Sequence, residues 1–250
     1  MDNTNYNLLA AQIVTFNNLT TTSNNIANIN TPGYKEDDMI FEKYLTKDKH
    51  DLNTMPLDRA TIVDIKPGSF KQTNRQLDFA ISGDAFFTVQ TPLGIRYTRN
   101  GTFTINNNYE VVNASGHNIV TENGNIVGLN QDDVDIMIDS EGRLFARATS
   151  QDNYEERGKL SIVSVANLKM LRKAGDGNFI VEGDTAVAQA DPATYKMLQG
   201  YIEESNVEPI VAMTHLVEIQ QQSGEALAMT KQIDSINNNL YNVLSKTGKG

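Results

Sequence analysis

The stretch that organises this chain is Ser23-Asn24-Asn25-Ile26-Ala27-Asn28-Ile29-Asn30-Thr31-Pro32-Gly33-Tyr34-Lys35, which follows a long segment of helical periodicity. Thr31 precedes a proline and is therefore disfavoured in helical geometry, whereas Gly33 accepts a left-handed turn without steric cost. The asparagine amides can bond backbone groups that the end of a helix leaves unpaired. Composition alone fits an ordinary helix end, so the stretch predicts at least a junction between a helix and the rest of the chain.

The segment before this junction predicts a weakly amphipathic helix from about residue 5 to residue 28. Its apolar positions recur every three or four residues, at Tyr6, Leu9, Ile13 and Phe16, and the same stripe then continues through small polar residues. Such a helix would be about 40 Å long at about 1.5 Å per residue. Because so narrow a stripe buries little, the helix needs a partner to be stable.

A second helix is predicted over the last forty or so residues. Asn206 is the preferred N-cap, which places Pro209 in the first turn, and Ser205 with Glu208 is the alternative capping box. Apolar residues alternate at three- and four-residue steps in a coiled-coil-like seam formed by Ala226, Met229, Ile233, Ile236, Leu240 and Val243. Gly224 costs about 1 kcal/mol relative to alanine in a helix interior, so the middle of this helix is expected to be soft or to approach a neighbour closely.

Between the helices the periodicity changes from helical to alternating. Short strands are predicted around residues 80–81, 86–89, 95–97, 102–105, 110–112, 136–138, 143–146 and 160–165, with turn residues between them. A short helix is expected near residues 166–172, and Asp176-Gly177-Asn178 indicates a hairpin turn. This spacing predicts an antiparallel all-β domain of sandwich or partly closed barrel type.

The predicted fold class is therefore α+β, with long N- and C-terminal helices that form a coiled-coil-like core element around a central β domain. The expected divisions are an N-terminal helix and junction (1–35), an irregular connection (36–64), a β-rich outer domain (65–200) and a C-terminal helix (201–250). The connection contains one apolar island from Phe41 to Leu45, which is interpreted first as a docking patch on a neighbouring domain.

Composition excludes several classes of partner. A net charge of −10 and an isoelectric point near 4.8 disfavour nucleic acid and anionic membrane surfaces. There are no cysteines, so disulfides and thiolate metal sites are excluded. The N-terminus shows no cleavable signal peptide, and no apolar run approaches the roughly 18 residues of a membrane span. We expect neither nucleic-acid binding nor membrane insertion.

The sequence offers no pattern typical of catalysis, and we predict no enzyme activity, cofactor or metal. His50, His117 and His215 are far apart in the chain and lack metal-ligand spacing. The acidic stretches 132–135 and 139–142 lack the ligand alternation of a calcium loop, and residues 175–177 lack the remaining elements of a phosphate loop.

The junction stretch closely resembles the N-terminal signature of the flagellar rod and hook proteins. The resemblance rests on Asn24, Asn25, Ala27, Asn28, Thr31, Pro32, Gly33 and Tyr34 and continues in residues 77–87, 96–103 and 204–209. Two local departures are Ala85, where the family usually has glycine, and Asn108-Tyr109-Glu110, which replaces a hairpin that usually contains glycine. Within the family the proximal-rod branch matches first and the distal-rod branch second.

This resemblance implies a structural subunit of the bacterial flagellar basal-body rod. Its terminal helices would pack with copies of itself and with other rod proteins in a torque-transmitting tube, while Asn28, Thr31, Pro32, Gly33 and Tyr34 set the angle to the outer domain. The resemblance also implies a rod that crosses the periplasm and export by the flagellar type III apparatus without a cleaved signal. Phe41 and Leu45 would then form a short export-gate motif.

Four alternatives remain. A distal-rod or hook-type axial protein differs only within the family. A monomer whose terminal helices fold back on the sheet fits the sequence pattern equally well. An extracellular adhesive or carbohydrate-binding β domain would need an exposed aromatic platform, which a chain without tryptophan does not readily supply. An enzyme ranks last.

Overall fold

The computed structural model describes residues 3–48, 51–149 and 153–247 of the 250-residue chain. The chain divides into two compact units, each assembled from separate parts of the sequence. The first, here called the helical unit, comprises Met1–Ala27, Asp37–Thr61 and Glu208–Gly250. The second, here called the β unit, comprises Asn28–Glu36 and Ile62–Val207. The predicted α+β class, with a helix at each end of an antiparallel β region, is confirmed.

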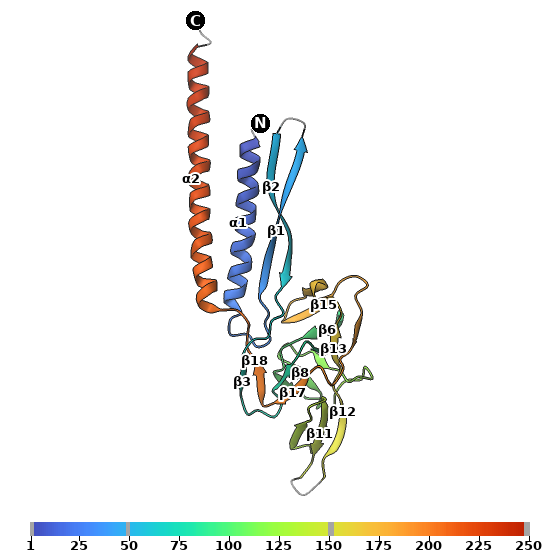
Figure 1. The fold of residues 1–250 in the computed structure, drawn as a ribbon. Coiled ribbons are helices and arrows are strands. Elements are labelled where there is room, and N and C mark those ends of the chain that lie inside the picture. Colours follow the sequence, from blue (N-terminus) through green and yellow to red (C-terminus); the bar gives the residue numbers. More distant parts are fainter. Residues whose placement is uncertain (1–2, 49–50, 150–152, 248–250) are drawn as a thin grey trace. The chain divides into compact units, whose positions relative to one another are not determined.

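The helical unit is built on the two terminal helices, α1 (Asn3–Ala27) and α2 (Pro209–Thr247), which run side by side in opposite directions (Figure 1). The Gln12 amide donates a hydrogen bond of 3.0 Å to the Thr230 hydroxyl across the pair. At about 1.5 Å per residue, the 39 residues of α2 extend beyond the 25 residues of α1 by roughly 20 Å.

One face of α2 is buried or half-buried along most of its described length. Its members follow alternating four- and three-residue steps and are Ala212, Leu216, Ile219, Ser223, Ala226, Thr230 and Ile233. Ala226 and Ile233 of the predicted seam lie on this face, whereas Met229 and Ile236 are exposed. The predicted seam therefore divides between two faces of the helix.

The helical unit also contains a β ribbon of β1 (Asp37–Asp48) and β2 (Asp51–Val63), which pair with each other, and α1 contacts β1. We expected residues 36–64 to be irregular, and the structure differs here. A two-stranded ribbon buries little on either face, so its strands need not show the strict alternation from which strands are recognised in sequence.

The β unit holds the remaining strands (Figure 1). Its largest sheet has the order β14-β15-β6-β5-β9-β8-β7, and β13 pairs with both β5 and β16. These nine strands are β5 (Phe86–Thr91), β6 (Gly94–Thr98), β7 (Phe103–Ile105), β8 (Val111–Asn113), β9 (Asn118–Ile119), β13 (Ile162–Val165), β14 (Leu171–Lys173), β15 (Asn178–Val181) and β16 (Val187–Gln189).

Smaller antiparallel sheets complete the β unit. They pair β10 (Asp135–Ile138), β11 (Arg143–Arg147) and β12 (Glu155–Lys159) in one sheet, β4 (Phe79–Ser82) with β17 (Lys196–Gln199), and β3 (Phe70–Gln72) with β18 (Tyr201–Glu203). Each of the eight segments that the sequence predicted as strands contains a strand, and the turn predicted at residues 176–178 joins β14 to β15. The segment predicted as a short helix forms one 3₁₀ turn, η1 (Leu168–Met170).

The large sheet carries an apolar cluster on each face. Phe87 and Ile162 belong to the first cluster, which also contains Ile136 and Leu144 of the three-stranded sheet. Their strand neighbours Phe86 and Val163 point to the opposite face and belong to the second cluster, with Val63 and Leu171. Since neighbouring residues of a strand point to opposite faces, the continuous apolar stretches of β5 and β13 are explained by this double burial.

The C-terminal helix begins later than predicted. The first intrahelical bond runs from the Ala212 N–H to the Glu208 carbonyl (2.9 Å), which makes Pro209 the first helical residue. The prediction of Asn206 as N-cap is therefore wrong. The Asn206 side chain is engaged elsewhere, because its oxygen accepts from the Glu36 N–H (2.7 Å) and its amide donates to the Asp64 carbonyl (2.9 Å). Residues 201–207 accordingly fold with the β unit.

Candidate functional site: the junction and the exposed helix faces

The junction segment 28–36 forms a compact turn within the β unit. The Thr31 N–H donates to the Asn28 carbonyl (3.1 Å), the Tyr34 N–H donates to the Thr31 carbonyl (3.2 Å), and the Thr31 hydroxyl bonds the Asn28 side chain (3.1 Å). Tyr34 is buried, and the Lys173 ammonium lies 3.8 Å from the centre of its ring. A cation over an aromatic face is an attractive contact. Hydrogen bonds therefore hold the beginning of this segment, and the contact between Lys173 and Tyr34 holds the part near its end.

Both the backbone conformation at residue 33 and the lack of space around it require a glycine. Its φ is +69°, and its N–H donates to the Glu203 carbonyl at 2.8 Å. A Cβ atom at this position would lie 2.3 Å from the Asn100 nitrogen, which belongs to the backbone and cannot rotate away. The backbone of the junction is therefore pressed directly against the loop that follows β6.

A buried charge cluster lies directly after Gly33. The Lys35 ammonium donates to a Glu203 carboxylate oxygen (2.5 Å) and to the Lys66 carbonyl (2.8 Å), and both side chains of the ion pair are fully buried. The other Glu203 oxygen lies 3.5 Å from the Arg99 guanidinium, which also donates to the carbonyls of Ile81 and Gly83. Burial lowers the pKa of Lys35 from its usual value, and the Glu203 carboxylate opposes that shift.

The cluster joins three separate parts of the chain. Lys35 comes from the junction, Arg99 from the end of the β5–β6 hairpin, and Glu203 from the last strand before α2. We assigned these three residues no role from the sequence, although all lie in or beside stretches that carry the family resemblance. Lys35 ends the junction stretch, but no pattern in the sequence indicates that its side chain is buried.

Asn25 forms a second connection, within the helical unit. Its amide donates to the Asp37 carbonyl and its oxygen accepts from the Asp37 N–H, both at 3.0 Å. The side chain thus pairs with the first residue of β1 as a neighbouring strand would. Asn25 is buried, whereas Asn24 and Ala27 are exposed on the last turns of α1 and Pro32 is half-buried in the junction.

The predicted seam residues on α1 are exposed. Leu9, Ile13 and Phe16 follow four- and three-residue steps, and Phe16 is 67% exposed. The side chains of Tyr6, Leu240, Val243, Phe41 and Leu45 lie outside the described residues, although their backbones lie in α1, α2 and β1.

A second stripe on α2 was not predicted. Four exposed apolar residues, Ile210, Met213, Val217 and Leu227, belong to a continuous three- and four-residue spacing whose other members are Gln220 and Gly224. A Cβ atom on Gly224 would contact nothing in the described structure. This exposed α2 stripe lies beside the buried face of the same helix.

The acidic stretches considered in the sequence analysis do not form a metal site in the described ranges. No group of three or more His, Asp or Glu side chains that could hold a metal ion occurs among these residues. The acidic stretch near residue 133 is engaged in ion pairs, with Asp133 bound by Arg157 (2.7 Å) and Asp135 bound by Arg147 (2.5 Å). No helix in the described part of the chain has the length and apolar character needed to cross a bilayer.

Comparison with known proteins gives two family matches. Residues 6–35 match the family described as "Flagella basal body rod protein", and residues 80–146 match the "Flagellar hook protein FlgE/F/G D1 domain". The first match contains the junction signature, and the second begins with β4 and ends in β11.

Full-length relatives agree with these matches. The flagellar basal-body rod protein FlgF of Mesorhizobium japonicum is 28% identical over 235 residues, which covers 94% of this chain and 95% of that protein. FlgF of Salmonella typhimurium is 28% identical over 87% of this chain and 88% of its own length. The rod protein FlgG of Bacillus subtilis is also 28% identical, over 88% of this chain and 90% of its own.

Proposed function

Because the chain belongs to the family of flagellar basal-body rod proteins, we propose that it is a structural subunit of the rod that assembles through its terminal helices into a torque-transmitting tube. The rod protein FlgF of Mesorhizobium japonicum is similar over 94% of this chain, which supports a place in the proximal rod. A distal-rod position is the alternative, since FlgG relatives show similar identity.

The exposed apolar faces of the terminal helices carry this proposal. Leu9, Ile13 and Phe16 on α1, together with Met229 and Ile236 on α2, are each more than half exposed in the single chain. The exposed α2 stripe adds a further apolar surface on the same unit. Apolar surface of this extent on a helix pair is costly in water and is covered when neighbouring copies pack side by side. Because the exposed stripes on the two helices differ, we expect α1 of one copy to pack on α2 of the next in a head-to-tail contact, which builds an open-ended filament when its rotation does not close a ring.

The same proposal includes the arrangement of the helices, the junction and the β unit within the tube. The two terminal helices form the coiled-coil-like wall of the tube, residues 28–36 set the angle at which each subunit leaves it, and the β unit is carried outside. A sandwich-like β unit is supported by its first apolar cluster, in which the large sheet meets the three-stranded sheet and the β4–β17 pair. A body held by two apolar clusters and a buried ion cluster is suited to transmit force.

We assign the subunit to the basal body, with copies of itself and other rod proteins as neighbours. Export by the flagellar type III apparatus, without a cleaved signal peptide, would deliver it across the inner membrane to a rod that crosses the periplasm. Phe41 and Leu45 are the residues that we propose for recognition at the export gate, and both belong to β1.

Ile236→Asp tests the assembly surface. A carboxylate on an exposed apolar stripe should block packing between subunits while leaving the β unit intact, because the desolvated charge would have no partner. The variant is introduced as the sole copy in a motile strain, and rods are examined by electron microscopy alongside swimming assays. We expect no rods beyond the point of insertion and no motility, with an unchanged β-sheet signal in circular dichroism of the purified chain.

Two control variants separate the apolar contact from the added charge. Ile236→Leu keeps the apolar surface and should assemble normally, and Gln221→Asp adds the same charge at an exposed polar position of α2. Normal rods from the Ile236→Asp strain would refute the seam assignment. Equal loss in Gln221→Asp would show that charge on any face of α2 suffices.

A further inference from the structure

A hollow on the β unit combines an aromatic ring with several amide side chains. It has a volume of about 370 Å³ and lies where β10 borders the segments 74–76 and 199–200. Met137 of β10 supplies an exposed apolar side chain to it. Its polar and aromatic lining residues are Asn74, Arg75, Gln76, Asp135, Tyr154 and Gln199. The contacts proposed for the terminal helices do not involve this hollow, since its lining belongs to the β unit.

The ring of Tyr154 is held in place by its own neighbours. Its hydroxyl donates to an Asp135 carboxylate oxygen (2.8 Å), and the Arg147 guanidinium carbon lies 4.6 Å from the ring centre. Asp135 in turn accepts from Arg147 (2.9 Å) and from the Gln76 amide (3.1 Å). Tyr154 is 36% exposed and borders the hollow, whereas Arg147 does not. A ring fixed in this way loses little conformational entropy when a ligand packs on its exposed part.

Apolar surface continues from the hollow across the three-stranded sheet. Ile136, Leu144 and Ala146 point into the first apolar cluster, so their strand neighbours point outward. Two of these neighbours, Met137 of β10 and Phe145 of β11, lie directly opposite each other, and Phe145 is half-buried. The hollow therefore adjoins a small apolar and aromatic surface, which a sequence without tryptophan did not suggest.

The charged side chains of the hollow are already paired within the chain. Asp135 accepts from a guanidinium, as described above, and Arg75 pairs with Asp78 (3.3 Å). By contrast, the Asn74 amide nitrogen and the Gln76 side-chain oxygen form no hydrogen bond within the described ranges. An occupant should therefore be uncharged and carry hydroxyl groups that can bond a donor and an acceptor side by side.

A peptide strand fits this place poorly, because the edge of β10 is closed. The Gln199 side chain accepts from the Ile138 N–H (3.2 Å) and donates to the Ile136 carbonyl (2.7 Å). These are the backbone groups through which an added strand would pair. A neutral sugar fits better, since its rim carries hydroxyl groups and its C–H face can pack on an aromatic ring.

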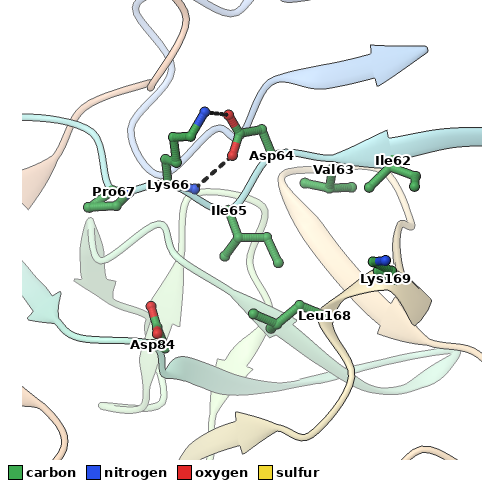
Figure 2. Close-up of a pocket in the computed structure, with 9 residues that line it drawn as sticks. All are labelled: Ile62, Val63, Asp64, Ile65, Lys66, Pro67, Asp84, Leu168 and Lys169. Atoms are coloured by element: carbon green, nitrogen blue, oxygen red, sulfur yellow. Dashed lines mark hydrogen bonds and ion pairs between the residues drawn. The ribbon is translucent and has the colours of Figure 1, made fainter. Parts of the chain in front are cut away.

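The hollow drawn in Figure 2 has a different lining. Ile65 and Leu168 point into it from the segment 62–67 and the 3₁₀ turn η1, and Asp64 at its edge pairs with the Lys66 ammonium (3.0 Å). Among the described residues, its lining contains neither an aromatic ring nor an amide side chain. It therefore lacks the groups on which recognition of a sugar depends.

We propose that the hollow beside Tyr154 binds a neutral glycan. One sugar ring packs on Tyr154, with its hydroxyl groups bonded to Asn74 and Gln76, and the adjoining ring lies over Met137 and Phe145. This site goes beyond the proposed function, which concerns the terminal helices. It needs no assembly, because all of its residues belong to the β unit of one chain.

Isotope labelling of the methionine methyl groups gives a local readout, because Met137 borders the hollow. The dilute full chain is titrated with chitotetraose, cellotetraose and maltotetraose, which distinguish the kind of sugar and linkage, and separately with a neutral strand-forming peptide. We expect a saturable shift of the Met137 methyl signal, assigned with Met137→Leu, for at least one saccharide. No shift with any of the three saccharides, or a shift with the peptide alone, would overturn the proposal.

Variants of the ring test its role directly. Tyr154→Ala should weaken saccharide binding roughly tenfold, because it removes the surface on which the sugar packs, whereas Tyr154→Phe should retain most of it. Tyr109→Ala is the matched control, since Tyr109 is similarly exposed, at 39%, but lies outside the hollow. Equal binding by Tyr154→Ala and Tyr109→Ala would contradict the proposed site. Ile236→Asp should bind the saccharide normally, so the glycan site and the helix contacts are tested independently.

Discussion

Three ionisable side chains meet in the interior of the β unit at the point where the junction crosses it. Glu203 is the only carboxylate in this group and lies against two cations, Lys35 and Arg99. Loss of one partner from a buried pair typically costs about 3–5 kcal/mol, because the remaining charge is left without compensation. Glu203 is therefore the residue whose substitution should most disturb the junction, since its loss would strand both cations.

Gly33 provides a sharper residue-scale prediction. Gly33→Ala should lower the free energy of unfolding of the β unit by more than about 2 kcal/mol, because it adds a steric clash to the cost of a left-handed residue. Gly183→Ala is the matched control, since its φ of +71° is nearly the same but a Cβ there contacts nothing. Urea unfolding measures both. Equal losses would mean that close packing on Asn100 contributes nothing.

Sequence reasoning at this scale succeeded where the constraint is local. A glycine after Thr-Pro predicts a turn, and Gly33 has the expected positive φ. Tyr109 also adopts a φ of +60°, in the hairpin where the sequence departs from the glycine-containing turn of the rod and hook proteins that it resembles. The burial of Lys35 could not be predicted, because its partner Glu203 is 168 residues away and only the folded chain brings them together.

At the scale of elements, strands were predictable where apolar and polar residues alternate or where both faces of the strand are buried. The other strands were not predictable from the sequence. The eight predicted strands contribute to the two apolar clusters or border them, so their side chains reveal them. Strands such as β3 and β18 are three residues long and are defined by pairing with each other rather than by apolar pattern. The α2 seam predicted from the sequence lies on more than one face of the helix, because a helix with apolar residues on several sides fits more than one stripe.

Gly224 gives a prediction for the helix itself. Gly224→Ala should stabilise α2 by about 1 kcal/mol, because this exposed glycine has no neighbour that a methyl group would strike. The measurement is amide exchange of residues 220–228 together with the helical signal in circular dichroism. Ala228→Gly, at another exposed position of α2, should change both in the opposite direction. A loss of helix in Gly224→Ala would show that the position needs glycine even in the single chain.

At the scale of the whole molecule, the two units differ in what holds them together. The β unit has two apolar clusters and a buried ion cluster, whereas the helical unit leaves many of its apolar side chains exposed. The sequence anticipated helices that need partners. It anticipated that the two terminal helices belong together, but not that residues 37–61 join them or that residues 28–36 fold with the β unit, since such assignments depend on long-range contacts that no local pattern records.

This difference should be visible in hydrogen exchange. In dilute protein we expect rapid exchange in α1 and α2 and slow exchange in the β unit, and the protection of the helices should increase with concentration as partners cover them. Ile236→Asp serves as the control, because it should remove the concentration dependence without changing the β unit. Slow exchange in both helices at every concentration would indicate a self-contained helical unit.

The pairing of Lys35 with Glu203 also has a consequence for the order of events during synthesis. The β unit begins with the junction segment 28–36, and its last strand is formed by residues 201–203. A chain that emerges from a ribosome or a narrow channel with its N-terminus first cannot complete this unit until Glu203 is outside. The β unit therefore stays incompletely folded until most of the polypeptide has emerged. A chain halted before Glu203 can still pass through a narrow channel.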